Sequence, residues 1–387
     1  MAAAGDSRRP GRGDAFFKHA LGIALAPSSP TLRQRLDARS TEMFEHVPPM
    51  IESLLALQRP DYGVLPCGWL ALDVDTFAMD NGHTAKEGIG RTYAGVDGYC
   101  PLAAYLGEHG FCLELALRPG TQHSAAETEF NVERIVPMAQ RLSAAGPKAP
   151  LLLRLDAGFD SVKLMRAIDA CNTPGLPGLP QADWLIKWNP RSTDAAGLAE
   201  QLDAQHPALW HPARAGKRVA LWQDELRIAG IERRIDRRGQ QLIVPEYELE
   251  GWSTSLPDRF SAQDIVALYA GHGTHEQFHA EFKSELDLER LPSGKFDTNY
   301  LVCQLAALAM NVLRLMGQRA LLGPDAPLRH AAKRRRIKTV MQELIYRAAR
   351  IVEHACSFVL GLGANDRAAA VFARQHRELR SPLAAAP

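Results

Sequence analysis

The sequence predicts an α/β fold in which a mixed β-sheet is flanked by helices, carries an inserted antiparallel β subdomain, and has helical N- and C-terminal segments. Three observations predict it. Apolar runs of strand length at 69–76, 99–106 and 111–117 are joined by glycine-rich connections of hairpin character. Helical and strand patterns then alternate from 127 to 188, and short β-type runs separated by glycines follow at 210–252.

The N-terminal segment predicts a tail and two helices. Residues 1–12 are polar and lack the apolar core of a signal peptide, so we expect them to be disordered. Ser28 and Pro30 are typical of a helix start. A second helix is expected at 43–57, before Pro60.

The next part of the chain alternates helices with strands. A helix is expected at 127–144, where Phe130, Ile135, Met138 and Leu142 recur near helical spacing. The elements expected after it are a strand ending at Asp156, a helix at 161–171 and a strand at 182–188. Three antiparallel strands followed by helix–strand–helix–strand units form the ribonuclease-H-like arrangement.

The remaining chain predicts an insertion followed by two helical blocks. Helical spacing returns at Asp264 and continues through Gly317, and a basic block from Pro327 is expected to be helical as far as Leu362, before a frayed terminus. The expected organisation is a tail and helical segment at 1–62, a catalytic domain in two parts at 63–190 and 261–323, a β-rich insertion at 191–260, and a basic helical segment at 324–387.

Composition restricts the class of protein. With 387 residues, 46% of them hydrophobic, the chain can form one large domain with an insertion, or two domains. The net charge is only +1, but eight Lys and Arg stand against four acids at 210–239, and eight against one at 327–350. The six cysteines lack C-x-x-C spacing and are expected to be reduced and buried. The apolar stretch at 301–315 is too short to cross a bilayer, so we expect a cytoplasmic protein without membrane contact.

The segment 269–283 fits two catalytic signatures, of which the first is a zinc site. His275, Glu276 and His279 form the H-E-x-x-H pattern, which on a helix places two imidazoles on zinc beside a glutamate base. No downstream segment offers an evident third ligand, so we favour a pair of solvated helix histidines over zinc ligands. Three acids that follow at spacings of four are expected on a solvated helix face: Glu281, Glu285 and Glu289.

The second signature joins the same glutamate to two aspartates upstream. Asp75 and Asp156 each end an apolar, strand-like run, and α/β sheets carry their chemistry at strand ends. Asp73 competes with Asp75, because strand alternation places both on one face. If these carboxylates converge with Glu276, the absence of His or Cys from the ligand set favours Mg²⁺ or Mn²⁺ over Zn²⁺.

The order and spacing of several segments resemble one protein family. The chain resembles DDE transposases of bacterial insertion sequences, most closely the insertion-sequence thirteen-eighty family, over roughly 28–356. The segments that carry the resemblance are 72–76, 98–102, 117–120, 154–159, 269–283 and 291–299. In the fifth of them, Tyr269, His272, Glu276 and Lys283 follow the family's Tyr-Arg-Glu-Lys spacing, with His272 in the position of the usual Arg.

The resemblance implies a metal-dependent site and a DNA substrate. It makes Asp75, Asp156 and Glu276 the ligands of two Mg²⁺ or Mn²⁺ ions, and it favours Asp75 over Asp73 because Thr76 follows as in the family. It implies that Tyr269, Lys283 and the residue at His272 contact DNA backbone. It also implies double-stranded DNA partners, namely terminal inverted repeats and target DNA, a homodimer in the DNA complex, and a nucleoid-associated protein in the bacterial cytoplasm.

Other basic and aromatic residues are candidates for DNA contact, each with a structural alternative. Arg118 and Arg154 either bind phosphate or balance neighbouring carboxylates. Trp252 either stacks on an unpaired base or belongs to the core of the insertion, as Trp210 and Trp222 do. The remaining candidates, which are either DNA contacts or solvated charges, are Arg233, Arg234, Lys333, Arg334, Arg335 and Arg336.

The function predicted from these features is that of a DNA transposase, which cuts element ends and joins them to target DNA by metal-assisted phosphoryl transfer. Two alternatives stay open. One is a catalytically silent, DNA-binding transposase remnant. The other is a zinc metallopeptidase that uses His275, Glu276 and His279.

Overall fold

The computed structural model describes residues 25–380 except 26, 173–177, 192, 207–209, 224, 324–325, 327, 329, 355–356, 364–365 and 367. The predicted disordered tail and Cys356 lie outside the described residues. Three of the five described cysteines are buried and two are partly buried, and all five are free thiols.

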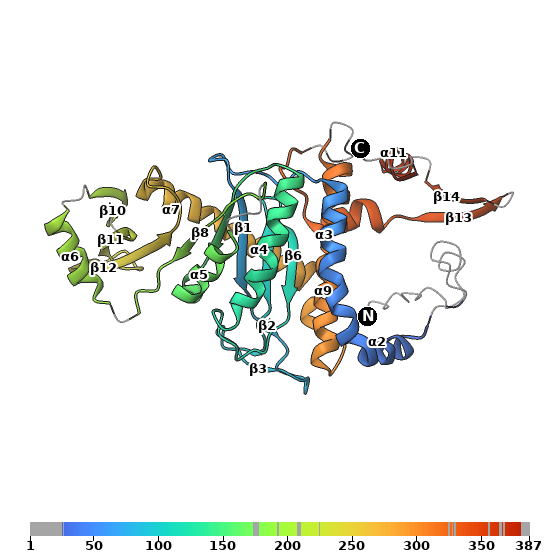
Figure 1. Ribbon diagram of the computed structural model, residues 1–387, viewed down its shortest axis with the longest axis horizontal. Helices are drawn as coiled ribbons and strands as arrows, with labels where there is room; N and C mark the ends of the chain where they lie inside the picture. Colours follow the sequence, from blue (N-terminus) through green and yellow to red (C-terminus); the bar gives the residue numbers. More distant parts are fainter. Residues whose placement is uncertain are drawn as a thin grey trace.

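A large mixed sheet forms the centre of the molecule (Figure 1). Its first five strands lie in the order β6-β5-β1-β7-β8. Strand β1 pairs antiparallel with β5 and parallel with β7, while β7 and β8 are also parallel. The bounds are β1 Leu70–Thr76, β5 Leu102–Leu106, β6 Phe111–Ala116, β7 Leu151–Leu155 and β8 Ala182–Lys187. The predicted mixed sheet flanked by helices is confirmed. A second, three-stranded sheet has the order β2-β4-β3 and comes from the chain between β1 and β5. Its strands are β2 Met79–Asp80, β3 Gly90–Arg91 and β4 Asp97–Tyr99.

The strands predicted as an insertion continue the central sheet. Strand β12 (Gln241–Thr254) pairs antiparallel with β8, with Trp252 opposite Lys187 and Thr254 opposite Leu185. Beyond β12 the sheet continues with β11 Arg227–Ile235, β10 Lys217–Gln223 and β9 His211–Arg214. Helix α6 Ala195–Gln205 precedes β9 along the chain. The insertion is therefore antiparallel, as expected, but it belongs to the same sheet as the strands that carry the predicted acids, which it joins through β8.

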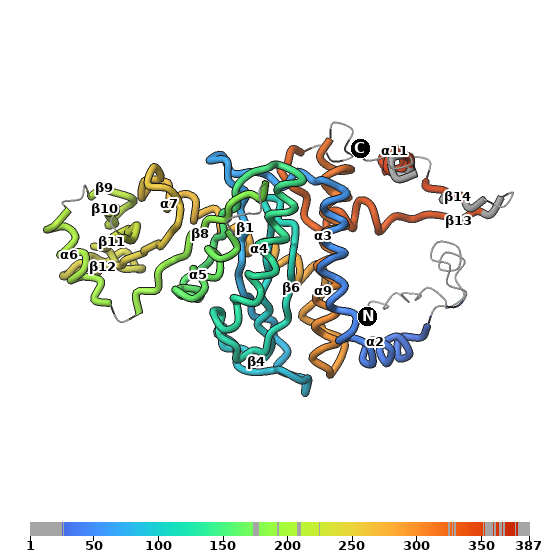
Figure 2. Tube along the Cα trace, in the orientation of Figure 1, coloured from blue at the N-terminus to red at the C-terminus, as the bar shows by residue number. Residues whose placement is uncertain are grey.

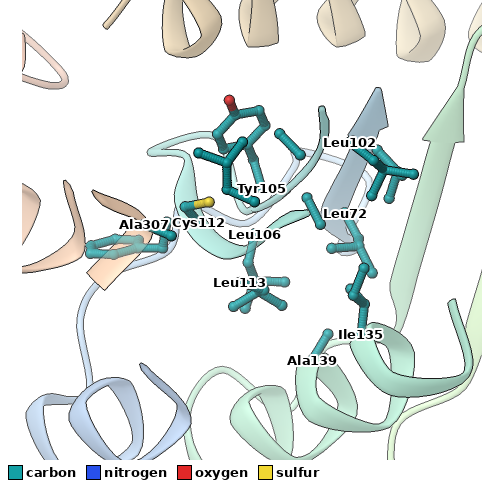
Figure 3. Close-up of a cluster of buried hydrophobic side chains, with 14 of the residues drawn as sticks. Leu72, Leu102, Tyr105, Leu106, Cys112, Leu113, Ile135, Ala139 and Ala307 are labelled. Carbon is teal, nitrogen blue, oxygen red and sulfur yellow. The ribbon is translucent and has the colours of Figure 1, made fainter. Parts of the chain in front are cut away.

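Helices α4 (Thr128–Ala145) and α5 (Val162–Ala170) link β6 to β7 and β7 to β8. Ile135 of α4 packs in the main core with Leu72 and Leu102, and Figure 3 shows these side chains together. The expectation that Phe130 lies on the same buried stripe is wrong, since its side chain is 66% exposed. Five helical residues rotate the chain by about 500°, which places Phe130 roughly 140° away from Ile135.

Helix α9 (Phe296–Leu321) closes the β6 edge of the sheet. The Asn311 amide accepts from the backbone N–H of Cys112 at 2.8 Å and donates to its carbonyl at 2.6 Å. Gln304 donates to the Leu115 carbonyl at 3.2 Å. These contacts satisfy backbone groups that an edge strand otherwise leaves open. By length and composition α9 also qualifies as a membrane-crossing helix, a property that buried core helices share, and more than half of its most apolar stretch is buried here.

The N-terminal helices α2 (Ser29–Met43) and α3 (Val47–Gln58) both pack against α9. Ser28 is the N-cap of α2, with its hydroxyl accepting from the Thr31 backbone N–H, and a proline follows in the first turn. The helix start predicted from Ser28 and Pro30 is therefore confirmed.

The C-terminal segment differs from the sequence prediction. After α10 (Ile337–Val340) and a π-helical turn at Met341–Ile345, the chain forms a hairpin of β13 (Ala349–His354) and β14 (Ser357–Leu362). Continuous helix as far as Leu362 is thus wrong. The hairpin sets Val352 opposite Val359, and β-branched residues favour the strand conformation. Helix α11 (Ala369–Arg380) follows. In Figures 1 and 2 the hairpin lies at the end of the molecule opposite the insertion (Figure 2).

Candidate active site

Asp73 is neutralised inside the protein by two basic side chains. The parallel register places it beside Arg154, whose Nε and Nη2 donate to the two carboxylate oxygens at 2.7 Å each. His272 Nδ1 lies 2.9 Å from the same carboxylate. Burial raises the pKa of Asp73, but Arg154 and His272 outweigh it and hold the pKa well below its ordinary value. Asp73 is therefore a buried carboxylate that its contacts hold in the charged form at neutral pH.

Asp75 and Asp156 emerge together at the carboxyl ends of two neighbouring parallel strands. Asp75 Oδ1 accepts from the Thr76 backbone N–H, and Asp156 Oδ1 accepts from the Gly158 backbone N–H, both at 2.7 Å. Burial, followed by the charge of Asp75, raises the pKa of Asp156. The two carboxylates are thus close enough for one to oppose ionisation of the other.

Glu276 lies on helix α8 (His275–Ala280), on its solvent side, with a side chain that is 75% exposed. Its Oε1 lies 3.9 Å from His275 Nε2. Asp75 Oδ2 lies 2.7 Å from the same nitrogen. The structure therefore brings Asp75 and Asp156 together and places Glu276 beside Asp75.

The two histidines of α8 face inward. His275 and His279 are 5% and 3% exposed, so the expectation of a solvated pair is wrong. The reason is packing: the His279 ring stacks on Phe77, with centroids 4.4 Å apart. Burial lowers the pKa of His279 to about 3. One ligand atom each from Asp75, His275 and His279 lies within 4.8 Å of the others. Asp75, the third member of this cluster, stands about 200 positions upstream of His275 in the sequence.

The aromatic candidates for DNA contact differ in their surroundings. Trp252 is 2% exposed and packs in a core cluster with Trp69 and Leu152, so its ring is covered. Tyr269 is partly buried beside Trp252 and His272, with ring centroids 5.9 and 5.4 Å away. Burial, followed by the charge of Asp156, raises the pKa of Tyr269. Tyr269 therefore borders the predicted acids, as its place in the signature leads one to expect.

Among the basic candidates near the sheet, Arg118 and Arg154 make internal contacts. Arg118 donates to the carbonyls of Ser124 and Ala126 at 3.0 and 2.9 Å, and so it holds the chain before α4. Arg154 pairs with Asp73. These contacts favour the structural alternative for both. His272 is 2% exposed beside Asp73, and Lys283 pairs with an acid, Glu289, at 3.2 Å.

Within the insertion, the two arginines singled out from the sequence pair with acids of the same sheet. Arg233 on β11 contacts Glu248 on β12 at 2.6 Å. Arg234 contacts Glu232 at 2.9 Å, and its side chain is 56% exposed. Both guanidinium groups lie on a sheet surface that also carries their partners.

The basic run at 333–336 is tied to the segment after α8. Glu281 is fully buried, with Arg314 at 2.6 Å and Arg334 at 2.7 Å, and Glu285 pairs with Arg336 at 2.6 Å. The expectation that Glu281 and Glu285 lie on a solvated face is wrong, because the arginines cover them. Two further members of the run are Arg335, which is buried and donates to backbone carbonyls, and Lys333, which is exposed.

Comparison with known proteins gives one match across nearly the whole chain. The family model described as "Transposase DDE domain group 1" matches residues 7–382. Among solved structures, the chain is similar to the piggyBac transposase in its synaptic complex with hairpin DNA, at 10% identity and a TM-score of 0.34. The likeness covers 64% of this chain and 47% of that one, so this chain spans about half of that protein. No curated protein matches the sequence.

Proposed function

Because the chain belongs to group 1 of the transposase DDE domain family, we propose that it is a DNA transposase that cuts transposon ends and transfers the strand to target DNA. The observation that carries the proposal is the meeting of Asp75 and Asp156 at the ends of β1 and β7, with Glu276 beside Asp75. The strand order β6-β5-β1-β7-β8 supports a ribonuclease-H-like catalytic domain. The motifs at 269–283 and 291–299 support membership of the thirteen-eighty type.

The proposed metal ligands fit a divalent cation. The charge of Asp75 raises the pKa of Asp156 in addition to the effect of burial, and a bound cation would offset that repulsion. Each aspartate has one oxygen fixed by a backbone N–H, so the second oxygen is the one that would bind a cation; in Asp75 that oxygen lies 2.7 Å from His275 Nε2. Divalent ions bound by Asp75, Asp156 and Glu276 would activate the attacking water or 3′-hydroxyl and stabilise the leaving oxygen.

The protein's own side chains would orient this site. The buried Asp73–Arg154 pair fixes β1 against β7, which sets the spacing of Asp75 and Asp156. Tyr269 borders both acids and would contact the DNA backbone there. Double-stranded DNA as the partner, a homodimer in the DNA complex and a cytoplasmic location belong to the same proposal.

The test is strand cleavage on DNA that carries the inverted repeats flanking the gene. With Mg²⁺ or Mn²⁺, Asp156→Asn and Glu276→Gln should abolish cleavage while DNA binding persists, because each change removes an anionic ligand. Glu289→Gln is the matched control, since this glutamate is also partly exposed but pairs with Lys283.

The outcomes separate the alternatives. Cleavage that survives in Glu276→Gln contradicts the proposed ligand set. Wild-type protein that binds the repeats without cutting them under any divalent ion identifies a silent remnant. Family membership already favours a transposase over the zinc metallopeptidase.

A further inference from the structure

Three buried ligand atoms converge beside the proposed catalytic acids. They belong to Asp75, His275 and His279, and all lie within 4.8 Å of one another. The Nε2 atoms of both histidines are inaccessible to solvent. His275 Nε2 faces Asp75 Oδ2 at 2.7 Å, whereas His279 Nε2 makes no hydrogen bond within the part of the chain that the structure describes. An unpaired polar atom in the interior is costly, so the buried His279 Nε2 beside a carboxylate and a second imidazole calls for an explanation.

The spacing of the three atoms is compatible with a shared metal ion. His275 Nε2 lies 2.7 Å from Asp75 Oδ2, closer than two ligands of one zinc ion would lie. Bond lengths of about 2.0–2.1 Å to zinc put tetrahedral ligand atoms roughly 3.3 Å apart. That separation falls between the 2.7 Å contact and the 4.8 Å limit of the cluster.

Each ligand is held from behind by a contact of its own. His275 Nδ1 donates to the His272 carbonyl, which turns Nε2 towards Asp75. The His279 ring is held against Phe77, and Asp75 Oδ1 is fixed by the Thr76 backbone. Such outer contacts orient ligands in established metal sites.

We propose that Asp75, His275 and His279 form a binding site for a borderline divalent ion such as Zn²⁺. Two imidazoles and one carboxylate suit Zn²⁺ and other transition metals, whereas Mg²⁺ prefers oxygen ligands. The site shares Asp75 with the proposed Mg²⁺ or Mn²⁺ ligands. Its effect on DNA cleavage therefore rests on the proposed function, but its existence does not.

Metal content and Zn²⁺ titration of the full chain test this site without reference to activity. Protein stripped with a chelator and then loaded with Zn²⁺ should hold one ion at this site after desalting. Because second-shell changes alone cost about 10–100-fold in metal affinity, loss of a direct ligand in His279→Gln or His275→Gln should weaken Zn²⁺ binding by at least about 100-fold. Asp75→Asn should do the same.

Two control variants test whether a loss of Zn²⁺ is specific to the three proposed ligands. His83→Gln changes an exposed histidine, and Glu276→Gln changes the neighbouring acid that lies outside the cluster; both should keep the Zn²⁺ affinity of the wild type. Co²⁺ loaded in place of Zn²⁺ should give visible absorption bands of a four-coordinate ion, which the His279→Gln variant loses. Circular dichroism checks that each variant is folded. If a histidine variant does not fold, the Zn²⁺ affinity of Asp75→Asn tests the site instead.

The outcomes distinguish this inference from the proposed function. Wild-type protein that cleaves DNA with Mg²⁺ but holds no Zn²⁺ overturns the inference and leaves the function standing. Zn²⁺ that stays bound in all three ligand variants also overturns it. Zn²⁺ lost from the ligand variants, in a protein that cuts no DNA, supports the site and sinks the proposed function.

Discussion

Replacing Asp73 with Asn should destabilise the protein strongly, although Asp73 is not a proposed metal ligand. The side chains of Asp73 and Arg154 are 2% and 3% exposed and share two contacts of 2.7 Å. An amide in place of the carboxylate leaves the Arg154 guanidinium buried without a counter-charge, and arginine cannot release its proton. Breaking a buried pair in this way costs about 3–5 kcal/mol. That is a large part of a typical total of about 5–15 kcal/mol.

Asp75→Asn is the matched comparison, because the change is chemically identical two residues along the same strand. Its contact, His275, can become neutral when the carboxylate is removed, and the repulsion felt by Asp156 disappears. The free energy of unfolding should therefore change far less than in Asp73→Asn. Urea denaturation followed by circular dichroism measures both.

The pH dependence of the Asp73 effect has a definite sign. The folded-state pKa of Asp73 lies below its unfolded value, so its contribution is present above the unfolded pKa of about 3.9 and is lost as the pH falls towards the folded value. The difference in stability between wild type and Asp73→Asn should shrink in acid. Equal denaturation midpoints for wild type and Asp73→Asn at neutral pH, or an equal loss in Asp75→Asn, refute the reasoning.

Three other perturbations give separate predictions. Charge reversal at Arg233 or Arg234 should weaken DNA binding, measured by fluorescence anisotropy. It should also lower the slope of log affinity against log salt by about one for each phosphate that the variant no longer neutralises. If binding is unchanged across the salt series, both arginines serve only to pair with acids of the sheet. Glu281→Gln should lower the free energy of unfolding by about 3–5 kcal/mol because Arg314 is left buried, and an unchanged urea midpoint contradicts this. Burial raises the pKa of Glu114, so wild-type stability should fall relative to Glu114→Gln as the pH rises from about 4.5 through the folded pKa; parallel pH profiles would show that its pKa is not raised.

The central strands could be predicted because their signals are local. The apolar run that contains Asp73 and Asp75 is long enough for one buried strand, and glycines mark its neighbours. The join between β12 and β8 gives no such signal, because Trp252 and Lys187 are partners only through long-range pairing. The β13–β14 hairpin could not be predicted in this way, because its segment follows a basic block that favours a helix.

The candidate site also has one part that the sequence predicts and another that depends on long-range contacts. Asp75 and Asp156 could be proposed from strand ends alone, without knowledge of their neighbours. The division of roles between Asp73 and Asp75 depends on the register of β1 with β7, which decides that Arg154 faces Asp73. The inward orientation of His279 depends on stacking with Phe77, a contact between two distant segments.

Because β8 and β12 are paired, the insertion is an extension of the central sheet and is not attached to it by a linker alone. Three successive residue pairs couple the two strands, and β8 in turn is bound along its length to β7, whose end carries Asp156. The outer strands are therefore connected through continuous backbone pairing to the strand that precedes Asp156. Amide hydrogens of β8 and the end of β12 should accordingly exchange with solvent as a single cooperative unit.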